Sequence, residues 1–376
     1  MTLPPKTTHP PYSVFIIGAG NIAALQDTPH SSNIITHAHA IQAHPSFRLL
    51  GFAEPDPNTR QIATERWSVP SYQSVEDWIS STTTQHKADV IAIAAPTQEH
   101  FPLLVKLIDW YDENKEERPF HLIFCEKPLV ADLAQAETIL RHSQQKQVPI
   151  CVNYSRRYLP RIQTLSQKIQ SQDWGALLGG TASYGKGLFN NGSHLIDLLV
   201  YFFGPMEVKQ TLTAVYDHFE FDPSISGVLQ VHPQDSANTS AFIYLQTIDC
   251  RAYTHFELDL FFERGRIKLT DLSTQIIEYT VQESSLYSGY RQLASCQTEE
   301  TQIQSAMSFA YNHLASYLPS CSPFPSQSHA LKLINPIEET LAVIQTCDKI
   351  YQSARDNNLL DNNVPKAAAI TEHKTC

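Results

Sequence analysis

The stretch Val14-Phe-Ile-Ile-Gly-Ala-Gly-Asn-Ile-Ala23 begins as a short apolar run and then breaks into small residues. This pattern predicts a buried strand that leads into a dinucleotide-binding turn. Gly18 would allow the tight bend, Gly20 would let the backbone approach a pyrophosphate, and Ala23 would let the following helix lie close to the strand. Small residues after a buried strand also form tight turns that bind nothing, so the motif alone leaves both interpretations open.

Asn21 and Ile22 follow the glycine turn and are candidate cofactor-binding residues, because the first N–H groups of the helix after this turn would bind the phosphates. A second apolar run, from Phe47 to Ala53, is followed by Glu54. This carboxylate could accept hydrogen bonds from the adenosine ribose and would repel a 2′-phosphate, which favours NAD over NADP. Arg60 could instead accommodate a 2′-phosphate, so NADP stays open.

The spacing between Gly18 and Glu54 is longer than the ~20 residues usual in a dinucleotide-binding unit. The polar, His-rich segment from Leu25 to His39 looks like the insertion responsible. Its histidines His37 and His39 raise the question of a metal site. No HExxH pattern or CxxC pair occurs in the sequence, so we expect no metal.

Short apolar runs alternate with amphipathic segments from residue 12 to about 150, which predicts βαβ units and a doubly wound parallel sheet. After Asn153, longer strand-like segments follow one another with few helices between them, which predicts an α+β domain on a large, mostly antiparallel sheet. We therefore expect an α/β Rossmann domain over 12–150 and a C-terminal α+β substrate and oligomerisation domain over 151–354. Residues 1–11 are expected to be flexible, and the polar residues 355–376 to be a disordered tail.

Composition limits the partners. The 376 residues are enough for about two domains, and 38 acidic against 27 basic residues leave a formal charge of −11. No basic run could follow a phosphate backbone, which argues against nucleic acid. The N-terminal residues lack the apolar core of a signal peptide, and no apolar run reaches the ~18 residues that a membrane span needs. We therefore expect a cytoplasmic protein. The seven scattered cysteines fit reduced thiols there.

Further candidate site residues follow the third and fourth predicted N-terminal strands. Because open α/β sheets bind ligands at the carboxyl ends of their strands, we expect these residues around the cofactor. Lys127 could also orient a substrate hydroxyl and help to move its proton. Glu-Lys-Pro could equally be an ordinary surface turn. The residues concerned are Ala95, Pro96, Thr97 and His100 after the third strand, and Glu126 and Lys127 after the fourth.

Asn190, His194 and Asp197 are spaced i, i+4 and i+7, and would share one face of a helix if that helix begins by Asn190. His194 has the near-neutral intrinsic pKa that suits a group taking a proton from an alcohol. Asp197 could fix the tautomer of His194 or bind a sugar hydroxyl. The alternative is a helix cap followed by a histidine that bonds to the backbone.

Several motifs together resemble the glucose-fructose oxidoreductase, inositol dehydrogenase and rhizopine-catabolism (Gfo/Idh/MocA) oxidoreductase family. They are Ile-Gly-Ala-Gly at 17–20, Ala-Ala-Pro-Thr at 94–97 with His100, Cys-Glu-Lys-Pro at 125–128 and Asn-Gly-Ser-His-Leu-Ile-Asp at 191–197. The resemblance implies a Rossmann domain, an open-sheet domain, and NAD(P)-dependent oxidation or reduction of sugars, cyclitols or their derivatives. It also implies homodimers or homotetramers formed through the sheet face.

The same resemblance assigns roles to residues. Lys127 matches the active-site lysine of the family, His194 its acid/base histidine, and Arg157 an Arg-aromatic element beside its site. Asn190 stands where many members carry an aspartate, so it would position substrate together with Asp197 and Arg157 rather than ionise.

We therefore expect a dehydrogenase or reductase that moves hydride between nicotinamide and a secondary alcohol or ketone of a polyhydroxylated small molecule. Substrate loops are sought at 179–191 and 287–291, where Tyr290 and Arg291 could contact a polar ligand. Three alternatives stay open: a sensor that binds dinucleotide without turnover, a structural subunit, and a glycosidase-like enzyme that uses bound NAD catalytically.

Overall fold

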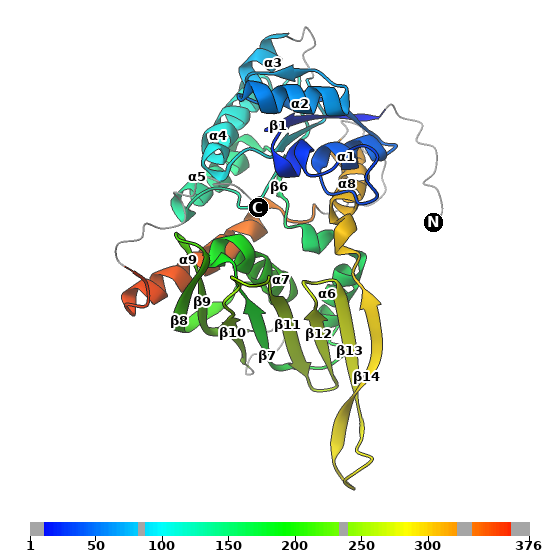
Figure 1. Ribbon diagram of the computed structural model, residues 1–376, viewed down its shortest axis with the longest axis vertical. Coiled ribbons are helices and arrows are strands. Elements are labelled where there is room, and N and C mark those ends of the chain that lie inside the picture. The colour runs from blue at the N-terminus through cyan, green and yellow to red at the C-terminus, as the bar shows by residue number, and fades with distance from the viewer. Residues whose placement is uncertain (1–10, 82–86, 233–239, 322–332, 362–376) are drawn as a thin grey trace. The chain divides into compact units, whose positions relative to one another are not determined.

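The computed structural model of the protein describes residues 11–81, 87–232, 240–321 and 333–361 (Figure 1). The chain divides into two compact units, each built from separated segments. The first unit comprises Met1–Val130, Glu137–Tyr158 and Gln304–Ile337, and the second Ala131–Ala136, Leu159–Ile303 and Glu338–Cys376. Of the two segments expected to lack order, residues 1–10 and 362–376 lie outside the described part of the chain, whereas residues 355 and 356 end a helix.

The first unit contains a six-stranded sheet in the order β3-β2-β1-β4-β5-β6, and all of its strand pairs are parallel. This order reverses between β1 and β4, which is where doubly wound sheets bind dinucleotides. The predicted parallel sheet is confirmed. Its strands are β1 Tyr12–Ile17, β2 Phe47–Ala53, β3 Ser71–Tyr72, β4 Val90–Ile93, β5 Leu122–Cys125 and β6 Ile150–Val152.

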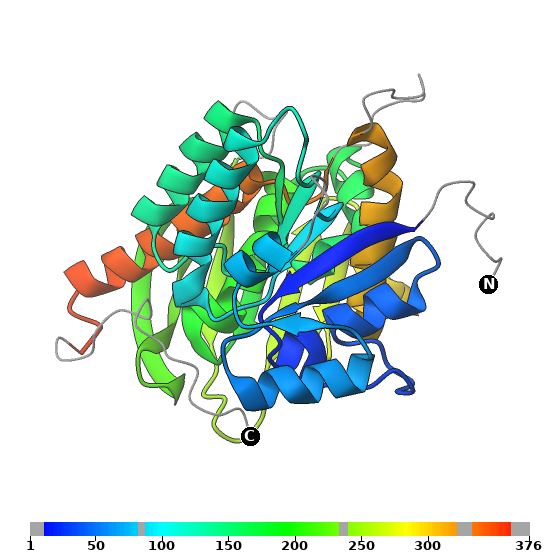
Figure 2. The same cartoon turned by 90° about the horizontal axis from the view of Figure 1, so that it is seen from above.

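Helices cover both faces of this sheet. Val14 and Ile16 of β1 belong to a core that includes residues of α1, α2 and α8, whereas Phe15 points the other way and stacks on Trp78 of α3 with ring centroids 3.8 Å apart. Figure 2 shows α8 on the same side of the sheet as α1, although most of the second unit lies between them in sequence. The helices are α1 His37–Ala43, α2 Pro57–Trp67, α3 Val75–Ser81, α4 Thr97–Glu113, α5 Leu133–Lys146 and α8 Ala306–Tyr317.

The segment after the glycine turn differs from the prediction. A single π-helical turn, η1 (Asn21–Leu25), stands where a regular helix was expected, and α1 begins only at His37. The residues between them are held by the buried carboxylate of Asp27. Asp27 accepts hydrogen bonds from the N–H of Ile35 (2.7 Å), from the N–H and hydroxyl of Thr36 (3.1 and 2.5 Å) and from Nδ1 of His39 (3.0 Å). The insertion is therefore an ordered loop tied to the start of α1.

The second unit contains an eight-stranded sheet in the order β14-β13-β12-β11-β7-β10-β9-β8, antiparallel except between β10 and β7. Figure 1 shows the β13–β14 hairpin projecting beyond the other strands of this sheet. The strands are β7 Leu177–Tyr184, β8 Glu207–Phe219, β9 Asp222–Val231, β10 Ala241–Thr247, β11 Phe256–Phe262, β12 Gly265–Thr270, β13 Gln275–Glu283 and β14 Arg291–Glu300.

This sheet has one packed face and one exposed face. Buried side chains alternate with more exposed ones along β10, β11 and β12, as expected for an antiparallel sheet with one solvated side. Phe242 and Tyr244 of β10 lie on the exposed side. The helical segments of this unit are α6 Pro160–Gln170, η3 Gly187–Gly192, α7 Ser193–Phe203 and α9 Ile337–Asp356, and η2 Ser155–Tyr158 precedes them in the first unit.

The first residues of the loop expected at 179–191 lie instead in the central strand β7. A side chain at Gly180 would place its Cβ 2.6 Å from the carbonyl oxygen of Asp259 on β11 and 3.0 Å from Ile243 on β10. Glycine therefore lets both neighbouring strands approach. Within the described residues, no helix has the length and apolar character needed to cross a membrane.

Candidate functional site

The glycine turn lies at the carboxyl edge of the first sheet. Gly18 has a φ of +93°, and a Cβ there would lie 2.6 Å from the carbonyl oxygen of Ala94 after β4. A glycine is needed here because the ends of β1 and β4 meet. Gly20 is different, since a Cβ there would meet nothing within 4 Å. The turn thus leaves open space beside Gly20 for the backbone to approach a pyrophosphate, and in this respect it fits a dinucleotide.

Glu54 follows β2 at the same edge, and it holds the turn directly. Its Oε2 accepts a hydrogen bond from the N–H of Ala19 (2.9 Å), and its Oε1 accepts one from the N–H of Asp56 (3.0 Å). A carboxylate has about four acceptor positions, so each oxygen can still accept a hydroxyl. The guanidinium of Arg60 donates to the carbonyl oxygens of Glu54 (2.6 Å) and Pro55 (3.0 Å). Arg60 is therefore engaged with backbone.

The residues after β4 form the start of α4. Pro96 caps this helix, which begins at Thr97, and Ala95 and Thr97 are half-buried at the sheet edge. The His100 side chain is only 1% exposed, and both of its ring nitrogens lie within hydrogen-bond distance of backbone carbonyl oxygens. Its contacts are therefore with the protein itself and not with the surface that a cofactor would reach. Its Nε2 is 2.8 Å from the oxygen of Ala95, and its Nδ1 is 2.9 Å from that of Pro128. His100 joins the start of α4 to the turn that contains Lys127.

Glu126 and Lys127 follow β5, and the Lys127–Pro128 peptide bond is cis. Oε1 of Glu126 accepts hydrogen bonds from Nε2 of His37 (2.9 Å) and Nδ2 of Asn153 (2.6 Å). Burial alone would raise the pKa of this carboxyl, but the hydrogen bond and charge of His37, the Asn153 amide and the Lys127 charge together hold the pKa of Glu126 below its ordinary value. Glu126 is thus a partly buried carboxylate, 13% exposed, that precedes Lys127 and favours its ionised form.

The predicted histidine helix in the second unit begins later than expected. Asn190 lies in the π-helical segment η3, whereas His194 and Asp197 lie in α7, which begins at Ser193. The shared α-helical face is therefore limited to His194 and Asp197, because a π turn changes the spacing between Asn190 and the later residues. His194 is half-buried and Asp197 is 1% exposed.

The sequence did not indicate what holds this segment. Asp222, a fully buried residue of β9, accepts hydrogen bonds from the N–H groups of Phe189 (2.9 Å) and Asn190 (2.8 Å). Asp217 of β8 accepts one from the N–H of Lys186 (2.7 Å). Two carboxylates therefore fix the backbone that precedes α7. An aspartate in a β-strand is uncommon, which is the one signal that the sequence offered for them.

The remaining candidates belong to different compact units of the chain. Lys127 and Arg157 belong to the first unit, where Arg157 is 1% exposed in η2, and Asn190, His194 and Asp197 belong to the second. Tyr290 lies at the tip of the β13–β14 hairpin and Arg291 begins β14, so the candidate loop at 287–291 is part of that projecting hairpin (Figure 1).

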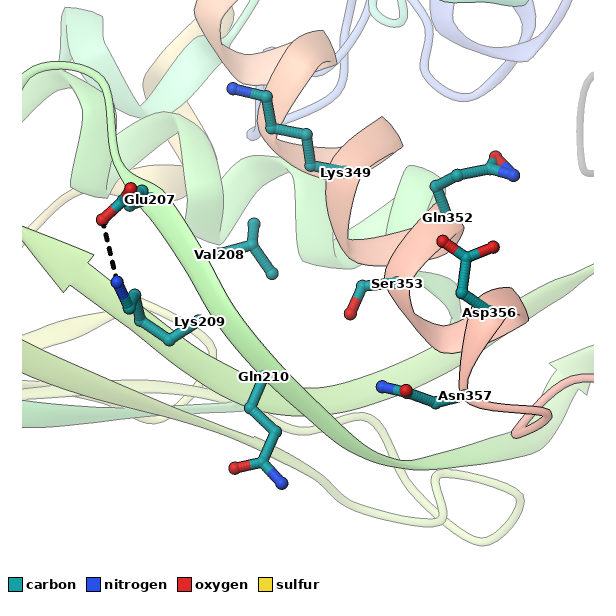
Figure 3. Close-up of a pocket in the computed structure, with 9 residues that line it drawn as sticks. All are labelled: Glu207, Val208, Lys209, Gln210, Lys349, Gln352, Ser353, Asp356 and Asn357. Carbon is teal, nitrogen blue, oxygen red and sulfur yellow. Dashed lines mark hydrogen bonds and ion pairs between the residues drawn. The ribbon is translucent and has the colours of Figure 1, made fainter.

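An open pocket of about 680 Å³ lies elsewhere in the second unit, between the start of β8 and the end of α9 (Figure 3). Lys209 and Glu207 pair across 3.1 Å on its β8 side, and Lys349 and Asp356 lie on its α9 side. None of the predicted site residues lines it. The charged side chains of this pocket are exposed and of both signs, and they do not point to a common centre. We therefore look for the reaction site at the edge of the first sheet.

The fold and the edge of the first sheet define a dinucleotide-binding oxidoreductase architecture. Residues 12–154 match the Gfo/Idh/MocA family model, which is described as an oxidoreductase family with an NAD-binding Rossmann fold. The resemblance seen in the motifs is therefore confirmed over residues 12–154. The predicted enzyme class, an NAD(P)-dependent dehydrogenase or reductase, is confirmed as well, and the NAD-binding fold agrees with the predicted cofactor. No curated protein sequence matches the chain.

Solved structures share the fold along almost the whole chain. The WlbA dehydrogenase from Chromobacterium violaceum, in complex with NADH and UDP-GlcNAcA, has a TM-score of 0.67 at 16% identity, covering 95% of this chain and 97% of its own. An oxidoreductase from Agrobacterium radiobacter, in complex with NAD+, L-tartaric acid and magnesium, has a TM-score of 0.65 at 15% identity, covering 92% and 97%. A super-repressor mutant of Gal80p from Saccharomyces cerevisiae has a TM-score of 0.69 at 15% identity, covering 92% and 96%.

Proposed function

We propose that the protein transfers hydride between NAD and a secondary alcohol or ketone of a sugar, cyclitol or sugar derivative. One observation carries this proposal: the Glu126–Lys127 turn follows β5 at the same sheet edge as the Gly18–Gly20 turn and Glu54, the edge at which doubly wound sheets bind dinucleotides. The sugar-nucleotide ligand of the WlbA dehydrogenase supports the substrate class.

In this proposal NAD, when bound, supplies the hydride acceptor or donor. Lys127 donates a hydrogen bond from its ammonium group to the reacting oxygen of the substrate. His194 takes the hydroxyl proton during oxidation and returns it during reduction, a step that suits an imidazole near neutral pH. Asn190, Asp197 and Arg157 bind the other polar groups of the substrate.

The preference for NAD over NADP rests on two contacts. The carboxylate of Glu54 faces the turn through the N–H of Ala19, so it would repel a 2′-phosphate placed at the ribose. Arg60 is already bonded to two backbone carbonyls and is not free to neutralise that phosphate without losing them. Both contacts favour a free 2′-hydroxyl.

The first test is calorimetric titration of the protein with NADH and with NADPH. Glu54→Ala is expected to weaken NADH binding about 10- to 100-fold, which corresponds to the ~1.5–3 kcal/mol of a hydrogen bond to a charged group. Glu65→Gln on the exposed side of α2 is the matched control and should bind as the wild type does. Failure of both cofactors to bind the wild-type protein would refute the proposal.

The second test concerns turnover. Sugars, inositols and sugar nucleotides are screened by nicotinamide absorbance, and the first substrate found is used with Lys127→Ala and His194→Ala. Each variant is expected to lose at least 100-fold in kcat, because general acid–base groups typically contribute 10²–10⁴-fold. Intact turnover in either variant would remove that residue from the reaction.

A second function has one observation in its favour, the similarity to a super-repressor mutant of Gal80p. In that function the protein would bind the dinucleotide and respond to it without turnover. Tight NADH binding together with no turnover across the whole substrate screen would favour this function over catalysis.

A further inference from the structure

The Lys127 turn is fixed on both of its flanks. On the C-terminal flank, Nδ1 of His100 lies 2.9 Å from the carbonyl oxygen of Pro128 and 3.2 Å from that of Leu129. On the N-terminal flank, the carboxylate of Glu126 is the central group, and its Oε2 accepts the N–H of Lys127 itself (3.3 Å). The direction in which the Lys127 side chain leaves the backbone therefore depends on where the Glu126 carboxylate is held.

His37 holds that carboxylate from the insertion. It is the first residue of α1 and is 0% exposed, and its Nε2 lies 2.9 Å from Oε1 of Glu126. Its Nδ1 lies 2.9 Å from the hydroxyl of Tyr311 on α8. Burial and the nearby charge of Glu126 raise the pKa of Tyr311 well above its ordinary value, so this hydroxyl keeps its proton. If the hydroxyl of Tyr311 donates to Nδ1 of His37, the neutral imidazole carries its proton on Nε2. The Nε2–H group then donates to the carboxylate of Glu126.

The position of His37 is itself determined by the insertion. Thr36 caps α1 by accepting the N–H of His39, and both the backbone and the hydroxyl of Thr36 are bonded to Asp27. Hydrogen bonds thus join Asp27 to Thr36 and His37 to Glu126, and Thr36 and His37 are neighbours in the chain. The site around Lys127 is supported by a segment that separates the glycine turn from α1.

We propose that His37 is a positioning residue for Lys127: by holding the carboxylate of Glu126, it fixes the turn that presents the lysine amine to bound cofactor and substrate. This proposal rests on the function proposed above, in which Lys127 acts on the substrate. The competing explanation is that His37 only stabilises the fold, as many buried histidines with two polar partners do.

Two substitutions separate these explanations. In His37→Gln the amide NH₂ group can occupy the position of Nε2 and still donate a hydrogen bond to Glu126. In His37→Asn the shorter side chain reaches only the position of Nδ1, so the hydrogen bond to Glu126 is lost. Tyr311→Phe removes the other hydrogen bond of His37 and leaves the contact with Glu126 in place. Only loss of the Glu126 contact should affect Lys127 if His37 positions it.

The readout is the modification of Lys127 by trinitrobenzenesulfonate, measured by peptide mass spectrometry with and without saturating NADH. Lys209, which is exposed in the second unit, serves as the internal reference. NADH is expected to slow the modification of Lys127 at least tenfold in the wild type, His37→Gln and Tyr311→Phe. In His37→Asn this protection should fall below threefold, while the affinity for NADH stays within threefold of the wild type.

Equal protection of Lys127 in wild type and His37→Asn would overturn the positioning role and leave the proposed function standing. Absence of NADH binding, or of protection in the wild type, would instead overturn the proposed function and this inference with it. If His37→Asn does not fold, Glu126→Ala replaces it, since that change also releases the N–H of Lys127. Full protection in Glu126→Ala would overturn the inference.

Discussion

Replacement of Asp27 tests whether the insertion is held by one buried carboxylate. Asp27 is 5% exposed and accepts hydrogen bonds from Ile35, Thr36 and His39. In Asp27→Asn the amide oxygen can keep the donors that now share Oδ2, and the hydroxyl of Thr36 can rotate to accept from the new NH₂ group. The change therefore removes the negative charge and leaves the number of hydrogen bonds nearly unchanged.

The size of the effect follows from the difference between charged and neutral hydrogen bonds. Each of the four bonds to the carboxylate is stronger by about 1 kcal/mol than its neutral counterpart, but the cost of burying the charge offsets part of this gain. We therefore expect Asp27→Asn to lower the free energy of unfolding by roughly 2 kcal/mol. Asp27→Ala also leaves buried N–H groups without an acceptor, and should lower it by roughly 4 kcal/mol. For a unit of this size, 2 kcal/mol corresponds to a Tm lower by about 4–8 °C.

The effect should also depend on pH. Burial opposes ionisation of Asp27, but its hydrogen bonds from the side chain of Thr36, the two backbone amides and His39 hold its pKa below the ordinary value. The folded state therefore gains stability from Asp27 above the unfolded pKa of about 3.9, and loses it as the pH falls through the lower folded pKa. The difference in stability between wild type and Asp27→Asn should be full at pH 6 and shrink below pH 4.

Differential scanning calorimetry and urea unfolding at pH 6 measure this difference. Asp56→Asn is the control, because Asp56 is exposed and caps α2 through the N–H of Thr59 (2.7 Å). Because asparagine caps a helix about as well as aspartate does, this variant should keep a Tm close to that of the wild type. A Tm of Asp27→Asn within 1 °C of the wild type, on the order of the scatter between scans, would refute the reasoning.

Four further predictions concern single positions. Gly18→Ala should destabilise the protein by about 1–3 kcal/mol, because its Cβ would lie 2.6 Å from the carbonyl oxygen of Ala94. Gly20→Ala, with open space for its Cβ, should instead keep the wild-type Tm and weaken NADH binding in calorimetry. Burial lowers the pKa of His313 to about 4, so stability should decline as the pH falls from about 6.5 toward 4, and this slope in the urea midpoint should flatten in His313→Gln. Gly180→Ala should lower the Tm by about 4 °C or more because its Cβ overlaps the backbone of β11, and an unchanged Tm in circular dichroism would contradict the close approach of β7 and β11.

The sequence was informative where chemistry follows the end of a strand. Apolar runs identified β1, β2, β4 and β5, and the residues after them, Gly18, Glu54 and Glu126, lie at one edge because parallel strands place their carboxyl ends together. The Glu-Lys-Pro motif and the order of the other motifs then identified the family. These signals are local, so a single sequence contains them.

The parts that could not be predicted depend on distant contacts. His37 and Glu126 are 89 residues apart, and His37 and Tyr311 are 274 residues apart, so no local pattern relates them. The π turn η1 has no compositional signature, because its residues would also suit an α-helix. Glycine weakens an isolated strand, so the sequence around Gly180 indicated a loop. In the structure Gly180 lies in β7, because β10 and β11 pack so close to it that a Cβ would overlap them.

The contribution of α8 to the first core has a consequence for synthesis on the ribosome. Met307, Ala310, Tyr311 and Leu314 of α8 pack in the same core as residues of β1 and β5, yet α8 is translated long after β6, which ends at Val152. At roughly 5–20 residues per second, this delay of about 150 residues lasts about 8–30 s. During that interval a nascent chain carries all six strands of the parallel sheet with part of one apolar face uncovered. Such a surface is one that chaperones bind, and a chain truncated after residue 158 would never cover it.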